Sequence, residues 1–352
     1  MRCLFSLNNT MKTKILITGG YGFIGTNLIN QLDSDLYEIA VLDNSSHGQF
    51  HEGIHNKCSR IFDVDIRDRD HVFDAVNHFR PDITFHFAGL VSIYDCHKNP
   101  HEAVDTNITG SINVFDALLQ YECPRVIFSE TSAVYEDSEL LHSGYHEGQS
   151  DPRTMYSSTK AAVATLAESY RKTRGLEYTA LRYFNVAGPI QDYKRTVPPL
   201  FAGVALRLLG GNNPIIFGDV TRRRDFIHVD DVNAFHMLCI FNPEQTTGQT
   251  FNLGTGTSNS LNEICEIVHT YLIAEDLIPC QALIYDKMPE INGEAHTIYA
   301  DIRKAQSLGW EPKHHIGSQI ADTINYLLEE VKSGSVDPKT FMTDLNTDAV
   351  KI

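Results

Sequence analysis

The sequence predicts an α/β fold in which a doubly wound parallel sheet carries a smaller, interleaved α/β lobe. Two observations lead to this prediction. From Lys14 to about Gly188, short apolar runs alternate with amphipathic stretches, and a glycine-rich turn follows the first run. Short buried strands separated by helices form parallel sheets, because the crossover between parallel neighbours is usually a helix. With 352 residues, of which 42% are hydrophobic, the chain can bury a sizeable core.

The apolar runs follow one another in a regular order. The first, KILIT from Lys14, precedes a helix expected from Gly22 to about Leu32, and a further helix is expected before Pro81. The later runs read YEIAVLD, RIFDVD, DITFHFA, RVIFSE and YTALRYF. Strands that are buried on both faces read as nearly continuous apolar runs. We therefore expect these runs to form one sheet, covered by the helices between them.

The alternation breaks after Gly188. Prolines and glycines cluster there, at Pro189, Pro198, Pro199, Gly210, Gly211 and Pro214. This composition is typical of a loop-rich second lobe. We expect the strand-like segments DFIHVDDV and FNLGTG to return to the sheet, so that the second lobe is interleaved with the first.

These patterns divide the chain. Residues 11–188 are predicted to form the first domain, with 226–252 returning to it. The second lobe takes residues 189–225 and 253–331. The ends, 1–10 and 332–352, are predicted to be flexible, since the tail from Lys332 is polar.

The charge balance argues against two classes of partner. The chain carries 29 basic and 45 acidic residues, a formal net charge of −16. Such a chain has no general attraction to nucleic acid phosphates or to anionic lipid. No apolar run approaches the roughly 20 residues of a membrane span. We expect neither nucleic acid nor membrane as a partner.

The seven cysteines are scattered, odd in number and never in C-x-x-C spacing. This usage favours reduced thiols over a disulfide framework or a zinc site. The first ten residues are too weakly apolar for a secretory signal, and Met11 is a candidate start. The sequence therefore predicts a cytoplasmic protein.

The stretch TGGYGFIG contains two glycine patterns. Gly20, Gly22 and Gly25 spell G-x-G-x-x-G, whereas Gly19, Gly22 and Gly25 spell G-x-x-G-x-x-G. The stretch follows a predicted strand and precedes a predicted helix, where close backbone approach and a helix N-terminus can hold a pyrophosphate. This context indicates dinucleotide binding.

Asp43 ends the next predicted strand, 24 residues after Gly19. A carboxylate at this position accepts hydrogen bonds from the adenosine ribose hydroxyls and repels a 2′-phosphate. This favours NAD over NADP. A tight turn followed by a surface aspartate is the alternative interpretation.

Three further side chains suggest oxidation chemistry. Tyr156 and Lys160 in YSSTK are four residues apart and share one helix face. A phenol has an ordinary pKa of about 10, so it acts as a base only if nearby positive charge lowers that pKa. Thr131 follows RVIFSE at the carboxyl end of a predicted strand, where its hydroxyl could bind a reacting oxygen. Taken singly, these residues also fit a solvated pair and a Ser/Thr turn cap.

Taken together, these motifs resemble the extended short-chain dehydrogenase/reductase family. Within it the chain is most similar to the NAD-dependent nucleotide-sugar epimerases and dehydratases, above all those that act on UDP-galactose. The similarity runs from about Lys14 to Trp310. It rests on TGGYGFIG, LDN, DVDIRD, HFAGL, DTNITG, SAVY, YSSTK, LRYFNVAGP, RRRDFIHVDDV, FNLGTG and ADIRKAQSLGW. It implies a Rossmann domain that binds NAD and a lobe that binds a nucleoside diphosphate sugar.

The resemblance also implies roles for individual residues. Tyr156 would be the acid/base, Lys160 would orient the nicotinamide ribose and lower the tyrosine pKa, and Thr131 matches the family's Ser/Thr. The implied cofactor-binding residues are Gly19, Gly22, Phe23, Ile24, Gly25, Asp43, Asn44, Asp65, Ile66, Phe87, Ala88, Gly89, Asn107, Tyr156, Lys160 and Phe184. The implied substrate-binding residues are Thr131, Asn185 and Arg224. The frame Gly19, Gly22, Gly25 is then the functional one.

Arg224 ends a run of three arginines in an acidic protein. Guanidinium groups bind phosphoryl groups bidentately, which suits a nucleoside diphosphate. One departure from the family's pattern is Ile291, in PEINGE, where these epimerases commonly have an arginine. Either the nucleotide binds differently, or Arg222 or Arg223 supplies the second phosphate contact.

The residues after Thr131 bear on the reaction. Related dehydratases carry an Asp-Glu pair there, whereas this chain has Ser132 and Ala133. Without paired carboxylates there is no acid and base for water elimination. The sequence therefore predicts a 4-epimerase that oxidises sugar C4 transiently through a 4-keto intermediate. A dehydratase or reductase of the same family is the alternative, and a non-catalytic NAD-binding module a second one.

Two further expectations complete the prediction. His47, His51 and His55 are spaced four apart, but the segment reads as a surface loop, so no metal site is predicted. The resemblance suggests a homodimer built from the helix after DTNITG and the helix that carries Tyr156.

Overall fold

The computed structural model describes residues 11–46, 52–135, 144–289 and 295–342. Its centre is a seven-stranded sheet in the order β11-β6-β5-β4-β1-β2-β3, in which every neighbouring pair is parallel. The strands are β1 (Thr13–Thr18), β2 (Tyr37–Asp43), β3 (Cys58–Asp63), β4 (Ile83–His86), β5 (Arg125–Thr131), β6 (Glu177–Tyr183) and β11 (Gln249–Leu253). The strand order reverses between β1 and β4, so the predicted doubly wound α/β fold is confirmed.

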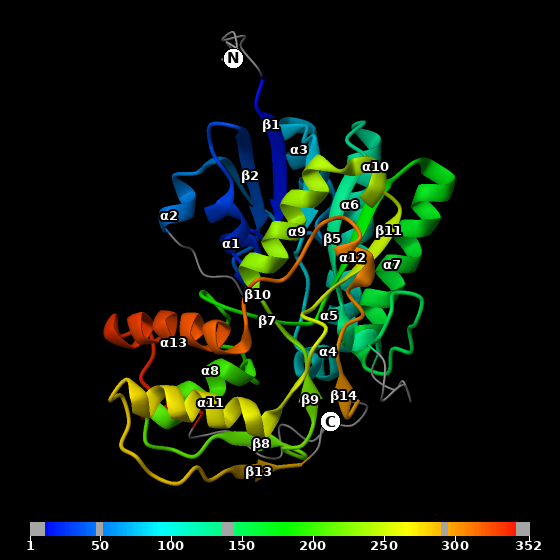
Figure 1. The fold of residues 1–352 in the computed structure, drawn as a ribbon. Helices are drawn as coiled ribbons and strands as arrows, with labels where there is room; N and C mark the ends of the chain where they lie inside the picture. Colours follow the sequence, from blue (N-terminus) through cyan, green and yellow to red (C-terminus); the bar gives the residue numbers. More distant parts are fainter. Residues whose placement is uncertain (1–10, 47–51, 136–143, 290–294, 343–352) are drawn as a thin grey trace, which may run out of the picture.

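Helices cover both faces of the sheet (Figure 1). On one face α1 (Phe23–Gln31) packs against α9 (Val229–Phe241), and on the other α3 (Arg69–Phe79), α6 (Gly110–Gln120) and α7 (Met155–Arg174) pack side by side. The strands divide their side chains between these two cores. In β1, Ile15 and Ile17 join the first core while Leu16 joins the second. This alternation fixes the register, because a shift by one residue would exchange the faces.

A smaller lobe lies beyond the carboxyl ends of the strands, in the lower part of Figure 1. Its own core is formed by α8 (Leu200–Leu209), α11 (Leu261–Ala274) and α13 (Ile316–Lys332). Its short strands are β8 (Ile215–Phe217) with β13 (Asp286–Met288), and β9 (Arg223–Arg224) between β12 (Asn259–Ser260) and β14 (Thr297–Ile298).

The segment DFIHVDDV does not join the main sheet as expected. β10 (Phe226–His228) pairs with β7 (Asn185–Ala187) in a separate two-stranded sheet, and the chain then enters α9. The second half of that expectation holds, since FNLGTG supplies β11 at the edge of the main sheet, beside β6. The main sheet thus contains a strand that follows the first part of the small lobe in sequence.

The remaining elements are short. They are α2 (Glu52–His55), α4 (Ile93–Lys98), α5 (Pro100–Val104), the π-helical turn η1 (Asp105–Thr109), the 3₁₀ turn η2 (Ser132–Tyr135), α10 (Pro243–Thr246) and α12 (Arg303–Gln306). In the described ranges no helix has both the length and the apolar character needed to span a bilayer. The cysteines in those ranges are all free thiols.

Candidate active site

A cleft of about 640 Å³ opens at the carboxyl ends of the central strands, facing the small lobe. This is where open α/β sheets bind their ligands. The structure brings most of the predicted site residues into its lining. They are Gly19, Gly22, Phe23, Ile24, Gly25, Asp43, Asn44, Asp65, Ile66, Phe87, Ala88, Gly89, Thr131, Tyr156, Phe184, Asn185 and Arg224.

The glycine turn between β1 and α1 leaves no room for side chains. Gly19 has a φ of 69°, and a Cβ on it would lie 2.6 Å from the backbone nitrogen of Ala88. A Cβ on Gly25 would lie 2.6 Å from the carbonyl oxygen of Gly19. Gly20 faces away from the cleft, where a Cβ would lie 2.7 Å from the side chain of Val41. Gly20 is therefore required for packing of the turn on β2 and is not part of the cleft wall.

The start of α1 suits a pyrophosphate. Gly22 is the N-cap residue, and no side chain caps the helix. The first backbone N–H groups of a helix have no partner within the helix, and the helix dipole favours an anion at this end. The sterically required glycines and this helix start together fit a dinucleotide.

Acidic side chains follow β2 and β3. Asp43 is buried and accepts hydrogen bonds from the backbone nitrogens of Tyr21 (3.0 Å) and Ser45 (2.8 Å). Asp65 binds the guanidinium of Arg67, with a closest contact of 2.6 Å, and accepts a hydrogen bond from Asn44. The hydrogen bond from Arg67 lowers the pKa of Asp65 to about 2. Arg67 also lines the cleft. It stands in the motif DVDIRD, from which no role was predicted for it.

The start of α7 positions the proposed catalytic pair. Thr154 caps the helix by accepting a hydrogen bond from the backbone nitrogen of Ser157, and the Ser157 side chain returns to the backbone of Thr154. This capping box fixes the first turn, so that Tyr156 lies in the cleft wall and Lys160 one turn later behind it. The Lys160 ammonium donates to the carbonyl oxygen (3.0 Å) and the hydroxyl (3.1 Å) of Ser129 on β5.

Asn107 does not line the cleft. Its amide nitrogen donates to the carbonyl oxygen of Leu90 and to the hydroxyl of Thr159, both at 2.9 Å, and its oxygen accepts from the nitrogen of Leu90. Both amide hydrogens are thus used within the protein. Asn107 connects the π-helical turn to α7 and to the segment after β4. It therefore supports the cleft from behind, whereas the sequence predicted a direct contact with the cofactor.

Burial sets the pKa values of the catalytic pair. It raises the pKa of the Tyr156 phenol to about 12, although a hydrogen bond from Thr131 opposes the shift. It lowers the pKa of the Lys160 ammonium to about 8, opposed by the nearby carboxylate of Glu130. The expectation that the protein's own cation lowers the tyrosine pKa is therefore wrong for the protein alone. Burial outweighs the charges, and the Lys160 ammonium is bound at Ser129.

The carboxylate before Thr131 is already engaged. Glu130 is buried, and its two oxygens accept hydrogen bonds from the Arg182 guanidinium at 2.8 and 2.9 Å. Arg182 also donates to the hydroxyl of Tyr135 at 2.6 Å. A carboxylate held in this bidentate pair is a poor general acid or base, because it would have to break a buried ion pair.

Of the three neighbouring arginines, only Arg224 lines the cleft. Arg222 is buried elsewhere, and Arg223 donates to the carbonyl oxygen of Ser258 and pairs with Glu263 at 3.3 Å. The expectation that Arg222 or Arg223 reaches a phosphate is therefore wrong. Ile291 lies outside the described residues.

Asp225 fixes the segment next to Arg224. Its carboxylate is fully buried and accepts hydrogen bonds from the backbone nitrogens of Thr255, Gly256 and Ala300. Asn185, which lines the cleft, donates from its side chain to the carbonyl oxygen of Asp225 at 2.8 Å. Asn185 is thus held by the main chain of Asp225, the residue that follows Arg224.

Sequence reasoning missed a further cleft arginine. Arg195 comes from the loop between β7 and α8 and lines the same cleft. It is an isolated arginine in a proline-rich segment, so no motif or spacing marks it.

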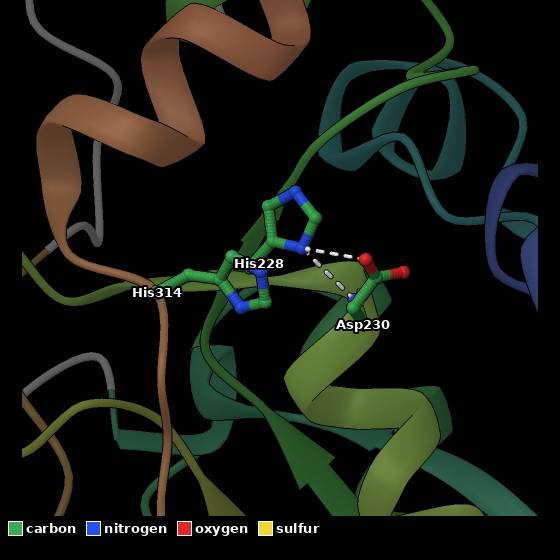
Figure 2. A group of neighbouring side chains, drawn as sticks. All are labelled: His228, Asp230 and His314. Carbon is green, nitrogen blue, oxygen red and sulfur yellow. Dashed lines mark hydrogen bonds and ion pairs between the residues drawn. The ribbon is translucent and has the colours of Figure 1, made fainter.

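One group of side chains outside the cleft has metal-ligand chemistry. Figure 2 shows His228, Asp230 and His314, the candidate group within the described residues. The Nδ1 atom of His228 accepts the backbone hydrogen of Asp230 at 3.1 Å and so caps α9. The His314 ring stacks on His228 with centroids 4.1 Å apart. Because the two rings are stacked, their in-plane lone pairs run parallel and do not converge on one point. The group is therefore better described as a helix cap than as a metal site. Of the histidines considered in the sequence, His47 and His51 lie outside the described residues, and His55 ends α2.

These features define a class of protein. The glycine turn, the acidic residue that ends β2, and the Thr131, Tyr156 and Lys160 set at one cleft are those of an NAD-dependent short-chain dehydrogenase/reductase.

The chain belongs to the NAD dependent epimerase/dehydratase family, whose model matches residues 15–254. It is 30% identical over 316 residues to a UDP-glucose 4-epimerase from Halalkalibacterium halodurans, which covers 85% of this chain and 91% of that protein. It is also similar to the crystal structure of a UDP-glucose 4-epimerase with UDP-glucose from Thermotoga maritima. The TM-score is 0.82 at 28% identity, covering 91% of this chain and all of that one. An epimerase from Thermus thermophilus, solved with NAD, gives a TM-score of 0.80 at 27% identity over 90% of this chain and 99% of that one.

Proposed function

We propose that this protein is a nucleotide-sugar 4-epimerase that acts on a UDP-hexose with NAD as a tightly bound cofactor. The observation that carries the proposal is that Thr131 and Tyr156 line the cleft that also contains the glycine turn, with Lys160 one helical turn behind Tyr156. UDP is proposed because the relatives named above are UDP-glucose 4-epimerases.

The protein's residues divide the work of binding NAD. The Gly19, Gly22 and Gly25 turn would hold the pyrophosphate, and Asp43 with Asn44 the adenosine ribose. Asp65 and Ile66 would contact the adenine, while Phe87, Ala88, Gly89 and Phe184 line the remaining wall. The glycine positions fit the cofactor, since a Cβ at either Gly19 or Gly25 would collide with backbone atoms.

Bound NAD would accept a hydride from sugar C4 and return it to the opposite face. The chain's residues handle the proton: Tyr156 takes it from the C4 hydroxyl and gives it back, while the Thr131 hydroxyl donates a hydrogen bond to the same oxygen. A phenol with a pKa of about 12 needs positive charge beside it to act at neutral pH. The nicotinamide cation would supply that charge, because burial outweighs the protein's own charges at Tyr156.

Epimerisation is favoured over dehydration by the residues around Thr131. Ser132 and Ala133 follow it in the cleft wall and carry no ionisable group. Glu130 is committed to Arg182. Elimination of water from the ring would need a free acid and base at these positions.

The experiment that tests the function is incubation of the protein with UDP-, GDP-, CDP- and dTDP-sugars, with products identified by NMR. We expect interconversion of a C4-epimeric UDP-hexose pair without added NADH. Tyr156→Phe should reduce turnover by about 10³-fold while NAD stays bound. Tyr121→Phe, half-buried at the end of α6 and outside the cleft lining, is the matched control.

Other outcomes identify the alternatives. Accumulation of a keto sugar would indicate a dehydratase, and consumption of added NAD(P)H a reductase. A protein that binds NAD but converts none of these sugars, and behaves the same with Tyr156→Phe, would be a regulatory module.

We further propose that the protein is a cytoplasmic homodimer, assembled through α6 and α7. The division into an NAD-binding part, 11–188 with 226–252, and a substrate lobe, 189–225 with 253–331, is also retained as a proposal. Light scattering on the purified protein would test the dimer, since a monomer mass would contradict it.

A further inference from the structure

Arg195 presents an unpartnered guanidinium to the cleft. Its Nε atom is buried and has no hydrogen-bond partner. Across the described ranges, no residue makes a hydrogen bond or an ion pair with it. Burial lowers its pKa, and the nearby carboxylates of Asp192 and Asp95 only partly offset that effect. The residue as a whole is half-buried. A cation that is partly withdrawn from water without a partner is costly, so such a group usually serves a ligand.

The loop segment that precedes Arg195 is fixed at two points. Gln191 is buried and donates to the carbonyl oxygen of Val186 at 2.8 Å. Tyr193 is buried and donates its hydroxyl hydrogen to Glu330 on α13 at 2.7 Å. The backbone leading to Arg195 is therefore positioned before a ligand arrives, which lowers the entropy cost of binding.

Arg195 lies toward the reacting end of the cleft. The groups whose charges act on it include Tyr156 and Asp95. Asp95 precedes Cys96, which packs with Leu90 against Met155 and Tyr156. Arg224, the proposed diphosphate ligand, lies on β9, where it pairs with Ile298 of β14. The two arginines thus come from different elements, and it is Arg195 that lies near the residue that must touch sugar C4.

We propose that Arg195 binds a carboxylate on the pyranose ring, so that the preferred substrate is a UDP-hexuronate. The inference rests on the proposed 4-epimerase function and specifies its substrate class. A guanidinium binds a carboxylate through two parallel hydrogen bonds, whereas neutral sugar hydroxyls would leave its charge uncompensated. A carboxyl group on C5 is next to C4, so it lies close to Tyr156 when C4 does.

The test compares two substrate pairs, UDP-glucuronate with UDP-galacturonate and UDP-glucose with UDP-galactose. We expect the protein to prefer the acidic pair. Arg195→Met should lower kcat/KM for the acidic pair about 100-fold, and for the neutral pair by less than about 5-fold. Arg195→Lys keeps the charge but loses the two parallel hydrogen bonds. Its kcat/KM for the acidic pair should lie between the values of the wild type and of Arg195→Met. Lys194→Met removes the neighbouring exposed cation and should leave both pairs unchanged.

A binding measurement separates this inference from the proposed function. Calorimetry on the Tyr156→Phe protein needs no turnover, and it should show UDP-glucuronate binding more tightly than UDP-glucose. Equal losses for both pairs in Arg195→Met, with weaker binding of UDP itself, would instead make Arg195 a diphosphate ligand. A wild-type protein that prefers the neutral pair would also overturn the inference and leave the epimerase function standing. If neither pair is converted and Tyr156→Phe has no effect, the function itself fails.

Discussion

At the scale of single residues, Lys160 shows how burial and function interact. Its ammonium is held by the carbonyl and hydroxyl of Ser129, and it is only 6% exposed. Two oxygen partners do not replace full hydration, and so its pKa falls to about 8. The charge that the proposed mechanism needs is therefore maintained at a cost in stability.

This cost predicts a pH dependence. Between pH 8 and 10.5 the native state has lost the Lys160 proton while the unfolded state retains it, so the free energy of unfolding rises with pH. Within this window the free energy of unfolding rises by about 1.4 kcal/mol per pH unit. Below pH 8 both states keep the proton, so this dependence on pH disappears. We expect the difference in unfolding free energy between wild type and Lys160→Met to rise by about 3 kcal/mol over this window.

Urea denaturation at a series of pH values measures that difference. Lys98→Met, which removes an exposed lysine, controls for the loss of one positive charge. A difference for Lys160→Met that stays constant from pH 8 to 10.5 would show that its ammonium is not destabilised by burial.

The sequence predicted the residues that belong to motifs and missed those that do not. Thr131, Tyr156 and Lys160 stand in spacings that the chemistry requires, and Tyr156 and Lys160 share a helix face whatever surrounds it. Arg195 belongs to no motif and reaches the cleft only because of the path of its loop. Asn107 was placed correctly in sequence, but whether its amide faces a cofactor or the protein depends on Leu90 and Thr159, which are distant along the chain.

At the scale of elements, the turn between β1 and α1 is the most tightly constrained part of the site. The atoms that a Cβ on Gly25 would meet are the Gly19 carbonyl oxygen at 2.6 Å and the Gly20 Cα at 2.8 Å. Both are backbone atoms, so no side-chain rotation can relieve the contact. The first turn of α1 would have to move away from the glycine turn.

We expect Gly25→Ala to weaken NAD binding by about 100-fold or more and to lower the free energy of unfolding by about 1–3 kcal/mol. Calorimetric titration with NAD and urea denaturation measure the two effects. Gly53→Ala in α2 is the matched control, since a Cβ there meets nothing within 4 Å. Equal NAD affinity in the two variants would argue against the pyrophosphate role of the turn.

The elements of the main sheet could be predicted because each is an apolar run with a helix after it. The strand β10 could not be assigned to its sheet in this way. FIHV is as apolar as the main strands, and its partner, β7, is only three residues long. A sequence pattern can predict that a short strand exists. It does not predict which strand pairs with it, because that depends on contacts across the whole fold.

At the scale of the whole molecule, the cleft lies between the sheet and the small lobe. Its lining runs from Gly19 on the sheet side to Tyr326 on α13. A ligand in the cleft therefore contacts both, and its binding energy adds to the stability of the folded chain.

We expect NAD at 100 times its dissociation constant to raise the free energy of unfolding by about 2.7 kcal/mol. NADP at the same concentration should stabilise the chain much less, because the buried carboxylate of Asp43 would repel its 2′-phosphate. Thermal denaturation with each cofactor makes the comparison. Equal stabilisation by both would contradict the proposed role of Asp43, and Asp43→Asn should reduce the discrimination.

The place of β11 in the sheet affects how the chain can fold during synthesis. Its neighbour β6 ends at Tyr183, but β11 begins only at Gln249, after β7 to β10 and α8 to α10. On the ribosome, a nascent chain that has just released β6 therefore presents that strand with one edge unpaired. Open strand edges recruit other chains. The first part of the small lobe and α9 must emerge before β11 can cover that edge.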